Sequence, residues 1–456
     1  MRQGCKASLN TVRSYFTFTK HLAGRLGRLR PASEEVSAVR TRTIIIRSSV
    51  AAVLILAAAC SDPDEAGGDE EPIVVGSTLP LTGAFAATGV IHQIAGEQFV
   101  EQLNANGGLL GRPVEWRLLD DESDQAQVTQ LYERLINQDE VDLIIGPYAT
   151  PNIIAAVAVA ERAGYVIPQH TAVLAPLLTY ECQFPGWSIG PTPDVYVPEQ
   201  LFEALASLPD PPTRLALVTN ESGSAGFMTN GLAEADTGGG MRAIAPEHGL
   251  EIAADLPYPP GNQEWGSIAA QLRDADPDLV INNGLGVDPV GLIEAMEQLD
   301  YRPPMFFSLF PAPGPLLGLG EPAEGALSVS IFEPNEPVLA QYGDEVRGIV
   351  DEFAQRATDA GVAYTAFETQ ATASWNTWET LAGGVEGADS LDQQVLCDHL
   401  RDNGVETTFS GHLTFDPAVS NFWPSNQGLK QIQDGEWVMV WPAERAAAPI
   451  QPPAAG

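Results

Sequence analysis

The stretch VDLIIGPYATPNIIAAVAVAERAGYVIPQHT, residues 141–171, decides the fold. Its apolar run at 141–145 predicts a buried strand, and the pattern at 152–162 predicts a helix. A second apolar run at 165–167 predicts the start of another strand. This order of strand, helix and strand is typical of a parallel sheet covered by helices.

The turn between the first strand and the helix is the first candidate binding element. It begins at Gly146 and continues through Tyr148, Ala149 and Thr150. A helix that follows such a turn points free backbone N–H groups and the positive end of its dipole into the crevice beyond the strands. The turn is therefore predicted to hold an anion or a carboxylate, with the Thr150 hydroxyl as a further donor. The alternative is an ordinary connection between a strand and a helix.

The same alternation extends outward from this stretch in both directions. Further strands are predicted at residues 73–77, 113–119, 214–219, 251–256, 279–282 and 305–309. Further helices are predicted at residues 93–104, 125–138, 198–207, 289–299, 343–360 and 367–381. Strands and helices joined by short turns predict an α/β fold.

Four motifs occur in a fixed order in the first part of this pattern. They are Leu81-Thr82-Gly83 with Gly89, NANGGLLGR at 104–112, DDESD at 120–124 and IIGP at 144–147. Together they resemble the periplasmic Leu/Ile/Val-binding proteins, the type I solute receptors of ABC importers, over residues 73–440. The resemblance implies two Rossmann-like lobes, joined by three crossing strands, that close on a small ligand.

The resemblance and the composition together divide the chain. We expect a leader with a lipoprotein signal peptide at 1–59, an acidic tether at 60–72, a first lobe at 73–193 and 335–412, a second lobe at 194–334 and 413–445, and a flexible tail at 446–456. The third crossing is expected near residues 411–416.

The leader has the features of a secretion signal. A flank with Arg40, Arg42 and Arg47 precedes an apolar run at 48–59, which is too short to span a bilayer. The run ends in Leu-Ala-Ala-Ala-Cys, which resembles a bacterial lipobox and implies lipidation of Cys60. We therefore expect an exported protein, lipid-anchored to the outer face of the cytoplasmic membrane or free in the periplasm. Translation is expected to begin nearer to Val39 than to Met1.

Charge excludes two classes of partner. The chain has 60 acidic and 23 basic residues, and residues 1–59 hold 10 of the basic but only two of the acidic ones. The part after the signal is therefore strongly acidic, and such a surface repels nucleic acid and anionic lipid. We expect no nucleic-acid partner and contact with the membrane through the lipid anchor only.

The resemblance also implies ligand-binding positions. The groups that hold a ligand carboxylate in the amino-acid receptors fall on Thr150, Gln169 and Thr171, all of which can donate a hydrogen bond. His170 lies between two of them and is either a ligand contact or a structural residue. Tyr148 and Ala149 belong to the same turn.

The positions that hold the amine end of an amino acid match less well. The family's aromatic residue of the second lobe falls on Ser224, and its acidic partner of the ammonium falls near Phe310. The aromatic wall of the first loop falls on Thr88, where Phe85 is a replacement. Because an unpaired ammonium is costly to bury, a carboxylate, amide, urea-like or aromatic solute is as credible a ligand as an α-amino acid.

Two asparagines and two cysteines complete the candidate residues. Asn282 and Asn283, at the expected end of a second-lobe strand, can hydrogen-bond an amide in both directions. Cys182 and Cys397 both fall in the first lobe, where an oxidising compartment permits a disulfide and two free thiols are the alternative.

No metal, cofactor or catalytic site is expected. The acidic run at 120–124 lacks the glycine and the distal glutamate of a calcium loop, so Asp124 is predicted to cap the next helix. The six histidines show no metal spacing, and no nucleophile lies in a hydrolase motif.

The sequence therefore predicts a substrate-binding protein that captures a small amino acid, amide or carboxylate and delivers it to an ABC permease. A ligand-sensing receptor of the same fold and a lipid-anchored enzyme are the alternatives.

Overall fold

The computed structural model describes residues 71–232, 238–424 and 427–451. The predicted leader, Cys60 and nearly all of the acidic tether lie outside the described residues. The described residues all belong to one folded unit. Within them, no helix has the length and apolarity that crossing a membrane requires.

The first lobe is built on parallel strands. These are β1 (Ile73–Leu79), β2 (Val114–Asp120), β3 (Leu143–Ile144), β4 (Ile167–Thr171) and β5 (Gln183–Trp187). They pair in the order β2-β1-β3, and β4 pairs with β5. The backbone N–H of Gly146 donates to the carbonyl of Pro168 over 2.7 Å, which places β4 beside the end of β3.

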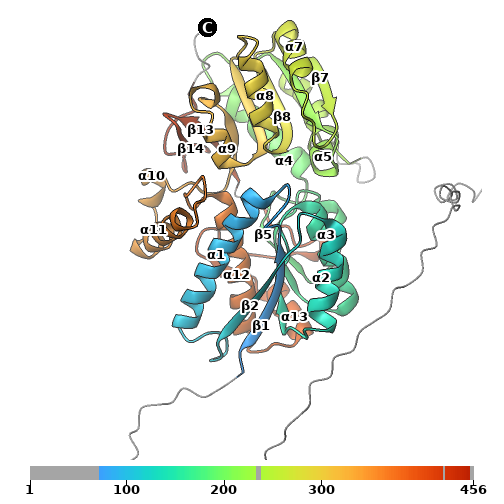
Figure 1. The fold of residues 1–456 in the computed structure, drawn as a ribbon, viewed down its shortest axis with the longest axis vertical. Coiled ribbons are helices and arrows are strands. Elements are labelled where there is room, and N and C mark those ends of the chain that lie inside the picture. Colours follow the sequence, from blue (N-terminus) through green and yellow to red (C-terminus); the bar gives the residue numbers. More distant parts are fainter. Residues whose placement is uncertain (1–70, 233–237, 425–426, 452–456) are drawn as a thin grey trace, which may run out of the picture. The chain divides into compact units, whose positions relative to one another are not determined.

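Helices cover both faces of these strands (Figure 1). They are α1 (Ala86–Ala105), α2 (Gln125–Asn137), α3 (Thr150–Ala163), α12 (Thr369–Ala388) and α13 (Gln393–Asn403), and α11 (Asp344–Asp359) packs on the outer side of α1. Leu143 packs toward α12 and α13, whereas its neighbour Ile144 packs toward α2 and α3. The side chain of Asp124 accepts hydrogen bonds from the first turn of α2, which confirms the predicted cap.

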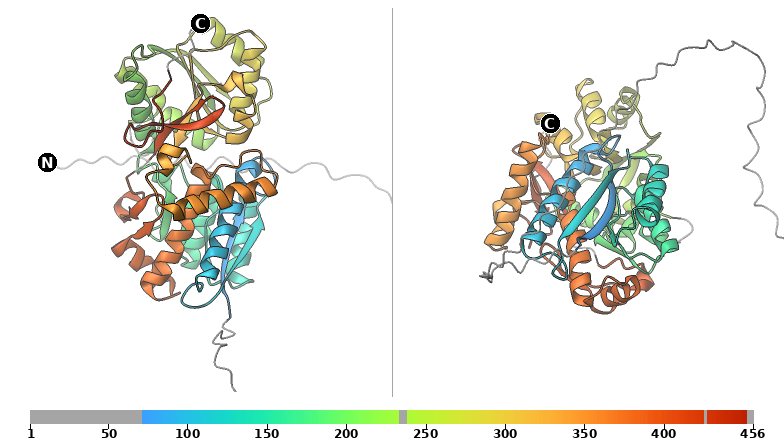
Figure 2. Two further views of the ribbon diagram at one scale, coloured as in Figure 1. Left: turned by 90° about the vertical axis from the view of Figure 1, so that its left-hand side faces the viewer. Right: turned by 60° about the horizontal axis from the view of Figure 1, so that its bottom comes forward.

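The second lobe holds a seven-stranded sheet of order β14-β13-β10-β9-β8-β6-β7. Its strands are β6 (Arg214–Asn220), β7 (Glu251–Tyr258), β8 (Leu279–Gly286), β9 (Met305–Pro311), β10 (Leu327–Ser330), β13 (Gly428–Gln433) and β14 (Glu436–Trp441). The first five run parallel to one another, and the β13–β14 hairpin closes one edge in antiparallel fashion (Figure 2).

Alternate residues of β6 face opposite helical layers. Leu215 and Leu217 pack toward one layer, whereas Ala216 and Val218 pack toward the other. The first layer holds α4 (Pro193–Ala206), α5 (Gly223–Asn230) and α6 (Met241–Ile244), and the second holds α7 (Gly266–Ala275), α8 (Asp288–Glu297) and α9 (Pro313–Leu317). A strand that is apolar on both sides is typical of a covered parallel sheet. The predicted α/β class is confirmed.

The chain passes between the lobes later than predicted at its third crossing. Residues 411–413, expected at this crossing, form β12 (Gly411–Leu413), which pairs with β11 (Val405–Thr407) in a hairpin. Leu413, Phe415 and Trp423 are buried in the first-lobe core. Because burial of these apolar side chains holds the segment in the first lobe, the chain enters the second lobe only between Trp423 and β13.

An ionic cluster is buried where the chain crosses. The ammonium of Lys430 on β13 lies 2.6 Å from Oε1 of Glu333, which follows β10, and 3.5 Å from Oε2 of Glu368, which caps α12. All three side chains are almost fully buried. Burial raises the pKa of Glu333 to about 7, although Lys430 opposes the shift. The cluster therefore joins both lobes through charges that water does not screen.

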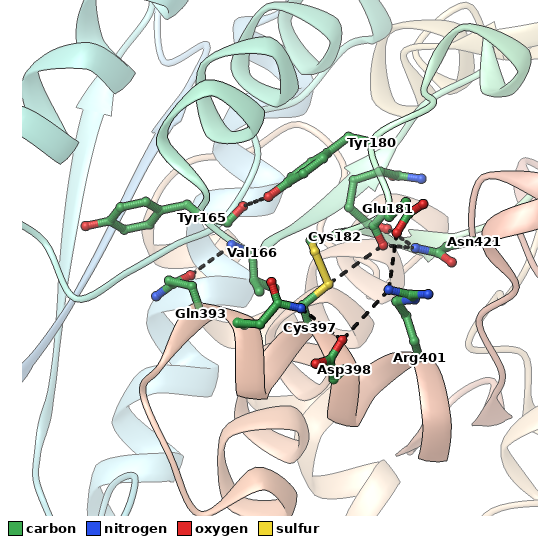
Figure 3. Close-up of a disulfide and its surroundings, with 12 residues drawn as sticks. Tyr165, Val166, Tyr180, Glu181, Cys182, Gln393, Cys397, Asp398, Arg401 and Asn421 are labelled. Atoms are coloured by element: carbon green, nitrogen blue, oxygen red, sulfur yellow. Dashed lines mark hydrogen bonds and ion pairs between the residues drawn. A yellow bond between two sulfur atoms is a disulfide. The ribbon is translucent and has the colours of Figure 1, made fainter.

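A disulfide joins Cys182, just before β5, to Cys397 on α13 (Figure 3). Next to it, Asn421 donates to the carbonyl of Glu181 over 2.8 Å, and Arg401 forms an ion pair with the Glu181 carboxylate. Of the two alternatives left open by the sequence, the structure shows the bridge. It fixes the beginning of β5 to a helix more than two hundred residues later.

Gly89 allows α1 to begin at Ala86, seven residues before the predicted start. A Cβ atom at this glycine would lie 2.0 Å from the carbonyl oxygen of Pro80. We expect Gly89→Ala to lower the free energy of unfolding by about 1–3 kcal/mol, because backbone must move to admit the methyl group. Urea denaturation measures this change.

The matched control is Gly348→Ala in the exposed interior of α11, where an added Cβ meets nothing within 4 Å. This change should stabilise the protein by up to about 1 kcal/mol, because alanine favours the helix. Equal stability of Gly89→Ala and the unsubstituted protein would contradict the predicted clash.

Candidate binding cavity

A cavity of about 270 Å³ opens where strands of both lobes end and helices begin. The first lobe contributes the amino-terminal ends of α1, α3 and α12, together with Trp187 at the end of β5. The second lobe contributes the start of α5 and the ends of β8 and β9. Carboxyl ends of parallel strands are where ligands bind in open α/β sheets.

Seven of the residues predicted from the sequence line this cavity. They are Phe85, Thr88, Tyr148, Ala149, Thr150, Ser224 and Phe310. The first five come from the first lobe and the last two from the second. The structure therefore brings together residues that lie up to 225 positions apart in the sequence.

Thr150 is arranged to donate into the cavity. It is the first residue of α3, and its Oγ1 accepts a hydrogen bond from the backbone N–H of Val173 over 3.0 Å. A hydroxyl that accepts from a backbone N–H keeps its own proton for another acceptor. The preceding residue, Ala149, has a φ of 76° and supplies no side-chain cap to the helix. The start of α3 therefore presents backbone and hydroxyl donors together.

A second helix begins at the same cavity from the other lobe. Ser222 precedes α5 without capping it through its side chain, and Gly223 and Ser224 form the first turn. Among the described residues, none is a hydrogen-bond partner of the buried Ser222 Oγ. Donors from both lobes therefore converge on one space.

Aromatic rings form much of the remaining wall. The ring of Phe85 meets Tyr148 edge-on with centroids 6.1 Å apart, and Trp187 meets Phe310 in the same way at 6.0 Å. Burial raises the pKa of Tyr148 to about 12, although its hydrogen bond with Thr88 opposes the shift. The phenol therefore keeps its proton at neutral pH.

Three predicted residues do not line the cavity. Gln169 is fully buried and donates to Gln183, and His170 is buried with Nδ1 3.2 Å from the carbonyl of Pro147. Asn283 is fully buried and donates to Thr229 over 2.6 Å.

The reason is the length of two strands. β4, of which only the start was predicted, continues to Thr171, and β8 continues to Gly286, beyond its predicted end at residue 282. Gln169, His170 and Asn283 therefore sit inside the sheets, and the edge is formed by later residues. Thr171 is the last residue of β4, where it pairs with Trp187.

The sequence interpretation missed the residues at these later edges. Val173 and Leu174 follow β4, Leu285 lies near the end of β8 and Val287 directly follows it, and Gln370 is the second residue of α12. Most are apolar and carry no chemical signal. The start of a helix near Gln370 was the only indication available for that residue.

The cavity wall carries no charged side chain among the residues that the structure describes, although the chain is strongly acidic overall. Nor do the described residues contain a group of three or more His, Cys, Asp or Glu that could hold a metal ion. The arrangement offers neutral hydrogen-bond donors at one side and apolar surface at the other. It has no carboxylate to pair with a ligand ammonium.

Comparisons with known proteins agree with this geometry. A family model described as periplasmic binding protein matches residues 72–422. A Leu/Ile/Val-binding protein homolog of Brucella abortus is 25% identical over 235 residues, which are 50% of this chain and 55% of that protein. An amino acid binding protein of Pseudomonas aeruginosa is 30% identical over 94 residues, 21% of this chain and 25% of that protein. The chain thus spans about half the length, or less, of these relatives.

Solved structures share the fold. A branched-chain amino acid transporter substrate binding protein of Streptococcus pneumoniae, in complex with isoleucine, superposes with a TM-score of 0.65 at 18% identity and covers 80% of this chain and 98% of that one. An ABC transporter solute binding protein of R. palustris, in complex with benzoate, has a TM-score of 0.65 at 18% identity. The match covers 85% of this chain and 98% of that one. At this identity the likeness concerns the fold alone.

Proposed function

Because the chain belongs to the periplasmic binding protein family, we propose that it is the substrate-binding protein of an ABC importer for a small carboxylate with an apolar body. This family consists of solute-binding receptors and not of enzymes, and it implies a location outside the cytoplasm. The ligand would be held between the lobes and delivered to a membrane permease.

The observation that carries the proposal is a cavity with donors and apolar walls but no charge. The starts of α3 and α5 and the hydroxyl of Thr150 suit a carboxylate, which binds well at helix amino termini. Trp187 and Phe310 suit a branched or aromatic body. An α-amino acid would bury its ammonium against this wall without an anionic partner, which is costly.

Closure of the lobes would be the change by which the permease recognises that a ligand is bound. The ligand would contact both lobes, since α3 and α5 belong to different ones. A ligand that binds the closed form better shifts the population toward it. A permease that recognises the closed form would then receive loaded protein, and lipidation of Cys60 would keep the receptor near the membrane.

Matched ligand pairs test this proposal. We expect isocaproate and hydrocinnamate to raise the thermal midpoint of the purified protein more than leucine and phenylalanine, which add only an α-ammonium. A ligand that binds the folded state alone raises stability by about 2.7 kcal/mol at 100 times its Kd. Titration calorimetry gives the Kd of each compound.

The variant Thr150→Ala should weaken carboxylate binding by about fivefold to a hundredfold, because one donor to a charged acceptor is lost. Thr358→Ala, on the exposed surface of α11, is the matched control and should leave the Kd unchanged. Tighter binding of the two amino acids than of their deaminated partners would overturn the proposed ligand class.

A further inference from the structure

His92 lies directly behind the cavity wall without lining it. It is fully buried on α1, with its ring centroid 5.0 Å from that of Tyr148 and 4.4 Å from that of His170. Its Nε2 lies 3.2 Å from Oε1 of Gln370, which does line the cavity. His92 therefore contacts two residues of the wall from its buried side.

The contact with Gln370 determines where the proton of His92 sits. An amide oxygen only accepts hydrogen bonds, so Nε2 of His92 must be the donor. Burial, together with the neighbouring His170, lowers the pKa of His92 well below its ordinary value, and the ring therefore carries one proton only. The proton is on Nε2, and Nδ1 is a bare acceptor.

The opposite arrangement is unfavourable. Nδ1 of His92 is buried and has no hydrogen-bond partner among the described residues. A proton on Nδ1 would create a buried N–H without an acceptor, which is rarer and costlier in proteins than an unpartnered acceptor. The neighbouring His170 carries its proton on the other ring nitrogen, Nδ1, because Nδ1 faces the carbonyl of Pro147 and donates to it.

Gln370 is thereby held in one orientation. Its backbone N–H donates to Glu368 over 2.9 Å at the start of α12, and its Oε1 is occupied by His92. No described residue accepts a hydrogen bond from its Nε2. The amide NH₂ is the end of the side chain that remains for the cavity.

We propose that His92 is a positioning residue for the ligand: its Nε2–H holds Gln370 so that the amide NH₂ donates to an acceptor atom of the bound solute. This role rests on the proposed function of the cavity. With its orientation fixed by His92, the Gln370 amide can only donate to the ligand and cannot rotate to accept. This point of the wall therefore favours a carboxylate oxygen over an amine.

A double-mutant cycle tests the role. His92→Phe keeps a ring beside Tyr148 and His170 but removes the donor, so the Gln370 amide is free to rotate. We expect this variant to bind hydrocinnamate about five- to tenfold more weakly. Its Kd for hydrocinnamamide, which can both donate and accept, should change by less than about twofold, because a rotated amide still serves it.

Gln370→Ala should weaken hydrocinnamate binding to a similar degree, and adding His92→Phe to it should have no further effect. A purely structural role of His92 predicts the same loss in both backgrounds, which would overturn the proposal.

The second measurement needs no ligand. Selective nitrogen-15 labelling of histidine, with His92→Phe to assign the signal, shows which ring nitrogen carries the proton. A proton on Nε2 is the expected result, and a proton on Nδ1 overturns the positioning role alone. If the unsubstituted protein binds neither hydrocinnamate nor isocaproate, the proposed function fails and the ligand role of Gln370 fails with it.

Discussion

Lys430→Met should lower the free energy of unfolding by about 3–5 kcal/mol, the largest loss expected from one substitution in this chain. The change leaves the carboxylates of Glu333 and Glu368 buried and without their cation, which lies 2.6 Å and 3.5 Å from them. Methionine fills a similar volume, so the loss reports charge and not a cavity. Urea denaturation at constant pH measures it.

The loss should also depend on pH. In the unsubstituted protein, burial raises the pKa of Glu333 from its ordinary value of 4.5 to about 7. A carboxyl group with a raised pKa in the folded state contributes stability that is present below pH 4.5 and lost as the pH rises through the folded value. Without Lys430, the pKa of Glu333 rises further. The loss of unfolding free energy in Lys430→Met, relative to the unsubstituted protein, should therefore be larger at pH 8 than at pH 5.

Two comparisons distinguish the cluster from an ordinary ion pair. Replacing Glu333 and Glu368 by glutamine as well should recover most of the stability, because no buried charge then remains. Arg356→Met removes a partly exposed arginine that pairs with Glu101 and Glu352, and it should cost about 1 kcal/mol or less. Similar losses for Lys430→Met and Arg356→Met would contradict the role assigned to burial.

The second large effect is expected from the disulfide. Replacing Cys182 and Cys397 by alanine should lower the free energy of unfolding by about 2–5 kcal/mol, because the bridge closes a loop over a sequence separation of 215 residues in the unfolded chain. The midpoint of urea denaturation measures the loss.

Reductant provides the control. Dithiothreitol should lower the midpoint of the unsubstituted protein toward that of the double variant, and it should leave the variant unchanged. A midpoint of the unsubstituted protein that does not respond to reductant under conditions that reduce the bridge would show that the bridge does not stabilise the fold.

The layered architecture was predictable because apolar periodicity carries it. The strands at β1, β2, β6 and β7 begin at or within one residue of their predicted positions, since each starts at the edge of an apolar run. The third crossing was not predictable. The apolar residues of 413–423 read equally well as second-lobe strand or first-lobe core, and only packing against α12 and α13 decides between them.

The candidate cavity was predictable on one lobe and only partly on the other. The turn at Tyr148 and Thr150 is predicted by a glycine, a proline and a following helix, and these signals are local in the sequence. Asn283 lies inside β8 and not at its end, because the end of β8 depends on pairing with β9, which no local pattern specifies. Gln370 was missed because its role depends on His92, a residue 278 positions earlier.

Because the cavity is neutral and the protein around it is acidic, different parts of the molecule affect the association rate and the dissociation rate of a solute. On the proposed function, a carboxylate would approach a strongly acidic chain, so its encounter rate would be reduced by repulsion and would rise as salt screens the field over about 8 Å. An amine would be drawn in faster but would meet no charged side chain among the described residues of the cavity wall, so it would leave sooner. The exterior thus sets how often a solute arrives, and the uncharged interior sets how long it stays.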